Sequence, residues 1–297
     1  MYLLSIIYYI TLYVEIFDLT VKGFSVKLLT MPPLIEVHNL SKYFFTPISF
    51  KRILKLDFKH KEPTCALQDI NFSVSGGNTL GILGLNGAGK TTLLKIIATL
   101  ILPDKGKIQV AGYLVGRDDE KIKSLVGLVS SSERSFYWRL SGRQNLEFFS
   151  SLYGLNKKQT KSRIDELMDL FGVDYQDRRF GEYSTGMQKK FVLMRALIHN
   201  PQILLLDEPT KSLDYATALR LRDFIKEKII KQQGKTVIFA THNLDEALDF
   251  ADSFMILHKG KLLALGTLQE LRRVVAKPQA TLGEIFLRIT QQEQYYA

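Results

Sequence analysis

A glycine-rich run in the first third of the chain constrains the fold most strongly. Its residues are Gly84, Leu85, Asn86, Gly87, Ala88, Gly89, Lys90, Thr91 and Thr92, which fit the pattern G-x-x-x-x-G-K-[ST]. The apolar run 79–83 predicts a short buried strand before it, and the apolar spacing over 93–101 predicts a helix that Pro103 ends. This strand–loop–helix context favours a phosphate-binding loop over a glycine-rich turn that only links two elements.

Each part of this loop has a physical role in holding phosphate. Glycines let backbone N–H groups turn inward around phosphate oxygens, and the N-terminus of the following helix adds partial positive charge. We expect Lys90 to reach the β- and γ-phosphates, the Thr91 hydroxyl to ligate Mg²⁺ and the Thr92 hydroxyl to contact the α-phosphate.

Two acids end a later strand. The apolar run 203–206 is followed directly by Asp207, Glu208 and Pro209. An aspartate at a strand end beside a phosphate loop can hold the metal, directly or through water. Glu208 then points elsewhere and can position or deprotonate the attacking water. The alternative is a pair of solvated turn acids, and the phosphate loop in the same chain favours the catalytic interpretation.

Apolar strands alternate with helical stretches along much of the chain. Strands are predicted over 34–37, 67–74, 79–83, 203–206, 236–240 and 254–257, with a helix over 213–232. This alternation predicts an α/β fold with a mainly parallel sheet covered on both faces. The mostly helical pattern of 134–200 predicts an inserted subdomain. We expect a core domain over 34–270, a C-terminal helical extension over 271–297 and a segment outside the fold over 1–33.

Composition narrows the setting of the chain. Of its 297 residues 46% are hydrophobic and 24% are charged, which is typical of a globular protein and excludes a disordered tail or a coiled-coil rod. The single cysteine, Cys65, excludes an internal disulfide and favours a reducing compartment. The net charge of +10 is compatible with nucleic acid, acidic lipid or a phosphate-rich ligand, and also with ordinary surface lysine. The basic stretch 46–63 is predicted to be a loop or insertion.

The N-terminus is apolar but short. Residues 1–14 carry no charge, and a spanning helix needs about 20 apolar residues. No positive charge precedes the run, as a secretory signal would require. Residues 1–30 could be an interfacial anchor, a segment that packs on a partner, or upstream sequence before a true start at Met31. We favour the last, because Met31 opens directly onto the first predicted strand.

Further motifs make the chain resemble the ATP-binding cassette (ABC) ATPases. The run 183–188, Tyr-Ser-Thr-Gly-Met-Gln, resembles the family signature LSGGQ and departs from it at Tyr183, Thr185 and Met187. Ser184 and Gly186 keep the hydroxyl and the bare backbone that could bind a γ-phosphate at a helix start. An ordinary helix cap is the alternative for an isolated S-T-G, but this run lies about twenty residues before the acid pair, as in the family.

The resemblance assigns three more residues. Asp214 lies in a run similar to the D-loop, and His242 matches the switch histidine, which in this family contacts the γ-phosphate. Tyr43 matches the aromatic residue that stacks on adenine, although its neighbours Phe44 and Phe45 are alternatives, as is core packing of Tyr43. Lys90, Glu208 and His242 are then the expected catalytic residues.

One departure concerns the family's glutamine between the phosphate loop and the signature. No glutamine occurs from Val110 to Arg143; Ser131 takes its place, and Glu133 could substitute for it. The stretches 133–140 and 281–287 resemble a subset of ABC exporter ATPases that share this change. Aromatic and basic side chains over 134–139 could form a docking surface for a coupling helix, with core packing as the alternative.

The resemblance implies a P-loop core with a mainly parallel sheet, an antiparallel β subdomain and a helical subdomain. It implies an exporter ATPase subunit that uses ATP and Mg²⁺, lies peripherally at the cytoplasmic face of the membrane and drives a separate permease. Two copies, or a copy and a homologous ATPase, would form a head-to-tail dimer with each ATP between Lys90 of one chain and Ser184 of the other.

Other functions fit the residues less well. A soluble ABC ATPase acting on nucleic acid or the ribosome is the alternative, but such chains carry two cassettes, a long coiled coil or zinc cysteines. Here one cassette is present, and only 93 residues separate Lys90 from Tyr183, so no nucleic-acid partner is expected. A GTPase would need N-K-x-D, which is missing after Lys158. A regulatory ATP-binding module would not need Glu208. The substrate, the direction of transport and the identity of the dimer partner stay open.

Overall fold

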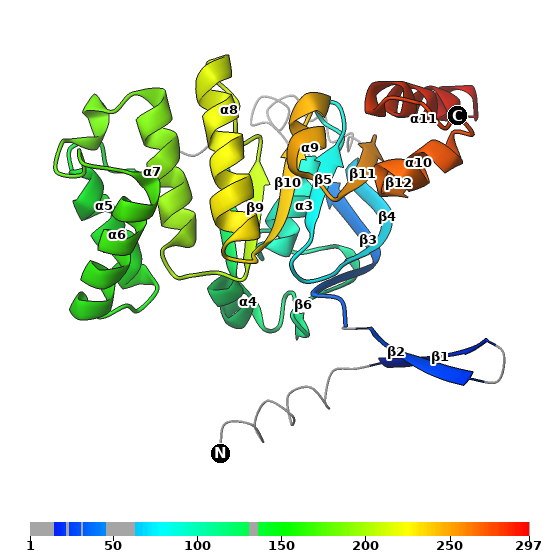
Figure 1. Ribbon diagram of the computed structural model, residues 1–297, viewed down its shortest axis with the longest axis horizontal. Helices are drawn as coiled ribbons and strands as arrows, with labels where there is room; N and C mark the ends of the chain where they lie inside the picture. The colour runs from blue at the N-terminus through cyan, green and yellow to red at the C-terminus, as the bar shows by residue number, and fades with distance from the viewer. Residues whose placement is uncertain (1–14, 22–23, 31, 46–62, 131–135, 297) are drawn as a thin grey trace, which may run out of the picture.

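The computed structural model describes residues 15–21, 24–30, 32–45, 63–130 and 136–296. A six-stranded sheet forms the centre of the molecule (Figure 1). In spatial order its strands are β12 (Lys261–Gly266), β11 (Ser253–His258), β5 (Thr79–Leu83), β10 (Thr236–Thr241), β9 (Ile203–Asp207) and β8 (Val126–Val129). Neighbouring strands are parallel except for β11 and β12. The predicted mainly parallel α/β sheet is confirmed.

Both faces of this sheet are buried, which explains why its strands are uninterrupted apolar runs. In β9, Leu204 and Leu206 belong to one hydrophobic cluster, while Ile203 and Leu205 belong to a second. Side chains alternate in this way because successive residues of a strand point to opposite faces. Helix α3 (Lys90–Ile97) contributes to the second cluster, and α8 (Tyr215–Phe224) and α9 (Leu244–Phe250) contribute to the first.

A four-stranded antiparallel sheet shares the second cluster with α3. Its strands in spatial order are β4 (Thr64–Val74), β3 (Ile35–Phe44), β6 (Lys105–Val110) and β7 (Tyr113–Leu114), followed in the chain by the short helix α4 (Asp119–Leu125). Ile35 and Ile70 of this sheet pack in the same cluster as Leu94 of α3. The antiparallel β subdomain that the resemblance implies is therefore present.

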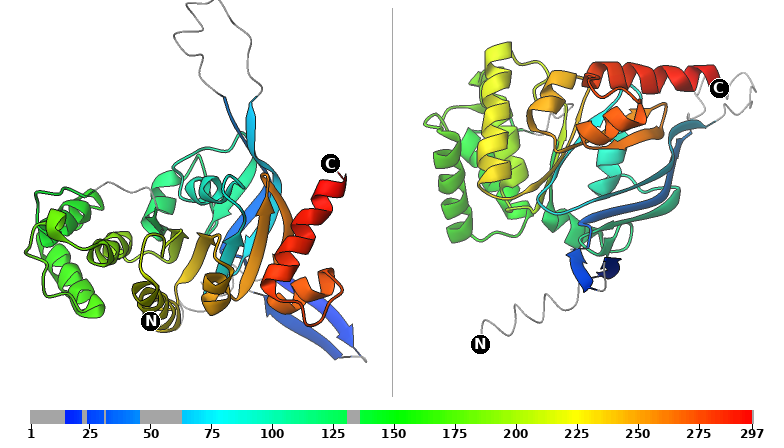
Figure 2. Two further views of the ribbon diagram at one scale, coloured as in Figure 1. Left: turned by 90° about the horizontal axis from the view of Figure 1, so that it is seen from above. Right: turned by 45° about the vertical axis from the view of Figure 1, so that its right-hand side comes forward.

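Three helices form a layer at one side of the central sheet (Figures 1 and 2). They are α5 (Gly142–Leu152), α6 (Lys157–Phe171) and α7 (Thr185–Leu197), with a short 3-10 turn over Phe180–Glu182. Ser141 and Asn156 begin α5 and α6 with capping boxes, in which each cap exchanges hydrogen bonds with a glutamine three residues later. These elements agree with the helical pattern predicted over 134–200.

Two helix boundaries differ from the predicted ones. The helix expected to continue to Pro103 ends at Ile97, because Thr99 adopts a left-handed conformation with φ of 58° and turns the chain away. That prediction was wrong for its last turn. Helix α8 starts at Tyr215 and continues as a π-helical segment over Ile225–Lys231, so the helix predicted over 213–232 has nearly its expected length.

The two ends of the chain lie outside the central layers. At the C-terminus, α10 (Leu268–Val274) and α11 (Leu282–Tyr296) follow β12, and Leu282 and Ile285 join the first cluster. At the other end, β1 (Glu15–Val21) and β2 (Phe24–Thr30) pair as an antiparallel hairpin, which forms a sheet of its own and was not predicted. The apolar run 1–14 and the basic stretch 46–62 lie outside the described residues. Among the helices that are described, none has the length and apolar character needed to cross a bilayer.

Candidate active site

Three adjacent parallel strands bring the predicted site residues to one edge of the central sheet. In β10, Thr241 is in register with Leu83 at the end of β5, and Ala240 is in register with Asp207 at the end of β9. The loops that follow β5, β9 and β10 therefore lie side by side. Ligands of open α/β sheets bind at this carboxyl edge of the strands.

The phosphate loop needs glycine for steric reasons. A Cβ atom on Gly84 would lie 2.4 Å from the Leu257 carbonyl oxygen, and one on Gly89 would lie 2.5 Å from that of Ala66. Gly87 and Gly89 also have φ of 81° and 104°, which side-chain-bearing residues rarely adopt. Only a bare backbone fits here, as a phosphate cradle of inward N–H groups requires.

The Lys90 side chain points back across the phosphate loop. It is 6% exposed, and its Nζ donates to the carbonyl oxygens of Gly84 at 2.7 Å and Leu85 at 3.2 Å. Burial lowers the pKa of Lys90, while the charges of Glu208 and Asp207 raise it. Because Nζ also lies 4.0 Å from the Glu208 carboxylate, the loop lysine and the second acid of the pair share one small region.

The two predicted metal ligands are in direct contact. The Thr91 hydroxyl lies 3.0 Å from Oδ1 and 3.1 Å from Oδ2 of Asp207, which is buried at the end of β9. A hydroxyl and a carboxylate are hard oxygen donors of the kind that Mg²⁺ prefers, and Mg²⁺ takes few protein ligands beside waters and phosphate oxygens. The donor set therefore fits Mg²⁺.

Glu208 points away from this pair, toward His242. Nδ1 of His242 lies 2.8 Å from the Glu208 carboxylate. The Glu208 backbone is left-handed, with φ of 52°, and its N–H donates to the carbonyl oxygen of Ala240 in β10. The adjacent acids thus serve different partners, because a turn at Glu208 directs its side chain to the neighbouring loop.

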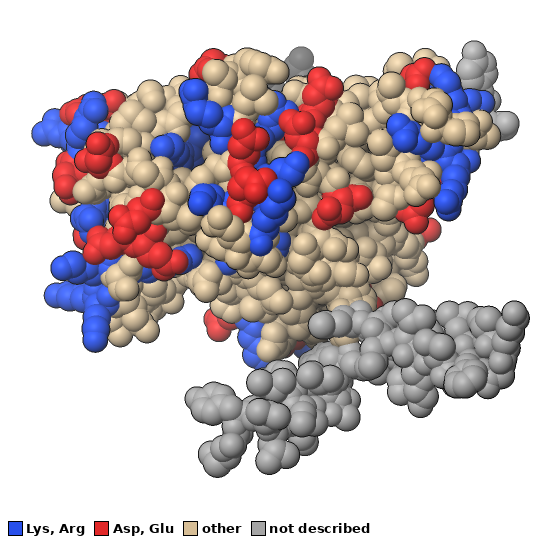
Figure 3. Space-filling model, viewed as in Figure 1, with Lys and Arg blue, Asp and Glu red and all other residues tan. Residues whose placement is uncertain are grey.

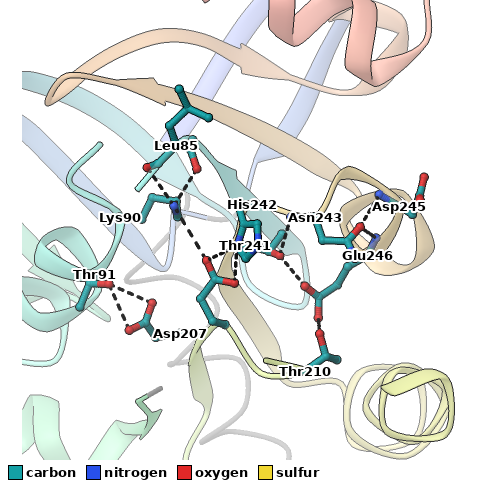
Figure 4. A network of polar contacts seen from close by, with 12 residues as sticks. Leu85, Lys90, Thr91, Asp207, Thr210, Thr241, His242, Asn243, Asp245 and Glu246 are labelled. Carbon is teal, nitrogen blue, oxygen red and sulfur yellow. Dashed lines mark hydrogen bonds and ion pairs between the residues drawn. The ribbon is translucent and has the colours of Figure 1, made fainter. Parts of the chain in front are cut away.

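Three residues around the site were not singled out as site residues from the sequence. Thr210 follows the acid pair, Thr241 precedes His242, and Glu246 lies on α9 (Figure 4). Glu246 accepts hydrogen bonds from the Thr210 hydroxyl at 2.7 Å and the Thr241 hydroxyl at 2.5 Å. An acid inside a helical pattern ordinarily faces solvent, so the sequence carried no clear signal for this buried one.

The signature-like residues lie on a different surface. Ser184 caps α7, its hydroxyl accepting from the Met187 N–H, and Asp214 caps α8 by accepting from the Thr217 N–H at 3.0 Å. Hydrogen bonds from the hydroxyl and the N–H of Thr217 lower the pKa of Asp214. Ser184, Gly186 and Thr217 line one groove between α7 and α8, to which no phosphate-loop residue contributes. Asp214 adjoins this groove through its hydrogen bond with Thr217.

The unusual Tyr183 of the signature-like run is a core residue. It packs against Phe191, and its hydroxyl donates to the carbonyl oxygen of Tyr175 at 3.0 Å. Burial raises the pKa of Tyr183 to about 12. Tyr183 therefore replaces a leucine in a packing position, and its one polar atom has a partner.

Tyr43 lies on β3 of the antiparallel sheet and pairs with Cys65 of β4, next to Ala66, whose carbonyl oxygen approaches Gly89 of the phosphate loop. The Tyr43 N–H donates to Asp104 at 2.6 Å, and Tyr43 lines a hollow with His38 and Lys105 of the same sheet. Phe44 and Phe45 beside it are exposed. No contact in the described residues selects among these three rings for adenine, so the assignment to Tyr43 stays a prediction.

The aromatic residues that follow β8 differ in burial. Ser131 and Glu133, predicted to replace the missing glutamine, lie outside the described residues. Phe136 is buried and stacks on Phe180 with ring centroids 4.3 Å apart, whereas Tyr137 and Trp138 are 50% and 60% exposed. Of these three aromatic residues, Phe136 therefore packs in the core, whereas Tyr137 and Trp138 do not. The buried amide of Asn145 fixes the loop by bonding both backbone groups of Tyr137.

Comparison with known proteins identifies the family. The ABC transporter family profile matches residues 67–211. The ABC transporter ATP-binding protein NatA of Bacillus subtilis is 39% identical over 212 residues, which are 71% of this chain and 85% of that protein. The chain belongs to the ABC transporter ATP-binding proteins. As an ABC ATPase it binds and hydrolyses ATP, which agrees with the resemblance drawn from its motifs.

Other relatives of this ABC ATPase are similar over comparable lengths. The daunorubicin resistance ATP-binding protein DrrA3 of Streptomyces coeruleorubidus is 36% identical over 208 residues, and the match spans 70% of this chain but 65% of that protein. A solved ATP-binding subunit of an ABC transporter superposes with a TM-score of 0.72 and 28% identity, over 86% of this chain and 99% of that one. A dimeric cassette bound to ADP and phosphate, with a TM-score of 0.66 and 23% identity over 79% of this chain and 98% of that one, shows the same fold.

Proposed function

We propose that this ABC ATPase is the energy-coupling subunit of an exporter, bound peripherally to a membrane permease at the cytoplasmic face. The observation that carries the proposal is the meeting of Lys90, the Thr91–Asp207 pair and the Glu208–His242 pair at one sheet edge. Similarity to the DrrA3 resistance protein supports the exporter class.

Residue roles follow from these contacts. Lys90 and the backbone of residues 84–89 would bind the nucleotide phosphates, with Thr92 on the α-phosphate. Thr91 and Asp207 would hold Mg²⁺, which supplies charge neutralisation at the phosphate oxygens. Glu208 would accept a proton from the attacking water, and His242 beside it would contact the γ-phosphate.

The groove between α7 and α8 supports a composite site in a head-to-tail dimer. Its lining carries Ser184 and Gly186 at a helix N-terminus and Lys189 one turn further on. A helix start with a nearby cation suits an anionic group. Since this groove is separate from the phosphate loop of the same chain, we assign it to the ATP held by a second copy or a homologous ATPase.

A second groove between the central sheet and the helical layer is suited to the permease. It is lined by Leu100, Leu128, Phe149 and Leu152 with Arg195 at its side. The exposed rings Tyr137 and Trp138 belong to the loop that leads into α5. We assign these residues to an apolar cytoplasmic segment of the permease, because exposed aromatic and aliphatic side chains mark protein contacts.

On the face of the molecule that Figure 3 shows, surface charge gives no support to a nucleic-acid partner. On that face, Lys and Arg side chains are interspersed with Asp and Glu rather than gathered into one band. Nucleic-acid surfaces are typically continuous basic patches. The charge of +10 is better interpreted as general surface charge that can also face anionic lipid.

The test is affinity purification of the tagged chain from membranes. We expect a multi-spanning protein to be recovered with it, and ATP hydrolysis by the complex to depend on Glu208. Recovery of ribosomes or nucleic acid in place of a membrane protein would contradict the proposal. A Ser184→Ala variant in the same assay reports on the composite site.

A further inference from the structure

The carboxylate of Glu246 connects the two loops that carry Glu208 and His242. Glu246 is 1% exposed. Its two carboxylate oxygens accept hydrogen bonds from two different segments, one from the Thr210 hydroxyl after β9 and one from the Thr241 hydroxyl at the end of β10 (Figure 4). Thr210 comes two residues after Glu208, and Thr241 comes immediately before His242. The Glu208–His242 contact itself also joins the two loops.

We propose that Glu246 is a positioning residue that holds Glu208 and His242 in their mutual geometry. The inference rests on the proposed roles of those two residues and adds a third that touches neither. Each threonine is itself tied into its own segment of the chain. The Asn243 N–H donates to the Thr241 hydroxyl at 3.0 Å, and the Thr210 carbonyl accepts from the Leu213 N–H at 3.1 Å.

Glu246 is in turn held firmly by its helix. Asn243 caps α9, and its side chain accepts from the N–H groups of Asp245 at 3.0 Å and Glu246 at 3.2 Å. Further along α9, Asp249 forms an ion pair with the buried Arg222 of α8. Helix α9 is thus anchored at its first turn by the Asn243 cap and near its end by the Asp249–Arg222 pair, which makes the Glu246 carboxylate a fixed attachment point for the two loops.

Burying a carboxylate costs free energy that an apolar side chain of the same size would not cost. Burial disfavours the charged form and raises the pKa of Glu246, and the nearby charge of Glu208 raises it further. An apolar side chain would fill the same space but would leave both threonine hydroxyls without an acceptor. A carboxylate offers two acceptor atoms about 2 Å apart, which is what two converging hydroxyls require.

The contacts predict which kinetic constant depends on Glu246. Lys90, Thr91 and Asp207 make their contacts without it, so phosphate and metal binding should survive its loss. Freed from Glu246, the loops after β9 and β10 can shift relative to each other, and displacement of a catalytic group by about 1 Å can lower turnover about a hundredfold. Turnover should therefore fall while ATP binding changes little.

The experiment compares Glu246→Ala, Glu246→Gln and Thr210→Val in the full chain, with Thr290→Val as a control that removes a buried hydroxyl from α11. We expect Glu246→Ala to lower kcat at least about tenfold with KM for ATP within about threefold of wild type. Glu246→Gln keeps one acceptor and one donor and should restore most of kcat. Thr210→Val should lower kcat by itself and add little to Glu246→Ala, because the two variants break the same link.

Thermal unfolding of each variant separates positioning from folding. Wild-type kcat in folded Glu246→Ala, or a rise in KM that matches the fall in kcat, overturns the proposal. If Glu246→Ala does not fold, Thr210→Val decides, and an unchanged kcat there overturns it as well. Loss of kcat in Thr290→Val to the same degree would also overturn it. An inactive wild-type chain with its permease contradicts the proposed function instead.

Discussion

Nδ1 of His242 lies 2.8 Å from the carboxylate of Glu208 although 34 residues separate them in the chain. The contact exists because β9 and β10 are parallel neighbours that end at the same edge of the sheet. It places the proposed base beside the residue that the family resemblance assigns to the γ-phosphate. Glu208 and His242 can therefore each be replaced to test its own effect on turnover.

Replacement of Glu208 by glutamine should stop hydrolysis without preventing ATP binding. The amide keeps the shape of the side chain but cannot accept a proton, so turnover should fall about 100-fold or more. The ATP-bound chain should then accumulate as a dimer, measured by light scattering with and without ATP. Glu227→Gln, which alters an exposed pair with Lys231, is the matched control. Wild-type turnover in Glu208→Gln would remove Glu208 as the base.

Replacement of Lys90 by alanine should weaken nucleotide binding. Lys90 donates to loop carbonyls in the structure and is the only cation placed by the described residues against Gly84 and Leu85. A hydrogen bond to a charged group contributes about 1.5–3 kcal/mol, so affinity should fall about 10- to 100-fold in calorimetry. Lys95→Ala, in the last turn of the same helix, should bind normally. Unchanged ATP affinity in Lys90→Ala would overturn the phosphate-loop assignment.

Local patterns singled out most residues of the candidate site, because the expected chemistry is concentrated in short runs. The phosphate loop and the acid pair each occupy adjacent residues, and apolar runs beside them placed both at strand ends. The links between runs were harder to predict. Thr210 and Glu246 are 36 residues apart, and only the parallel pairing of β9 with β10 brings their loops together.

Other misses have equally specific causes. The early end of α3 depends on the left-handed backbone of Thr99, a residue type that does not ordinarily signal a helix end. The hairpin of β1 and β2 was hidden within a segment interpreted as lying outside the fold. Among the aromatic residues after β8, periodicity could not distinguish the buried Phe136 from the exposed Trp138, because the segment is neither helix nor strand.

Alanine variants of Phe136 and Trp138 should affect different properties, the first stability and the second binding of the permease. Phe136 stacks on Phe180 and packs edge-on against Phe149, so Phe136→Ala should lower the free energy of unfolding by about 3 kcal/mol. Trp138→Ala, at an exposed position, should change it by less than about 1 kcal/mol but should reduce recovery of the permease. Urea denaturation and co-purification measure the two effects. Full permease recovery with Trp138→Ala would argue against this docking surface.

The buried His199 should make the fold sensitive to acid. Its ring stacks on Tyr153 and its Nε2 lies 3.1 Å from the Val126 carbonyl oxygen, and burial lowers the pKa of His199 to about 4. The folded chain then holds fewer protons than the unfolded one, whose histidine has a pKa near 6.5. Stability from this group is complete above about pH 6.5 and is lost as the pH falls toward 4, by about 2 kcal/mol at pH 5. Urea denaturation at pH 7.5 and pH 5 should show this loss in wild type and in the exposed control His38→Gln, but not in His199→Gln. An equal acid loss in His199→Gln would show that other groups cause it.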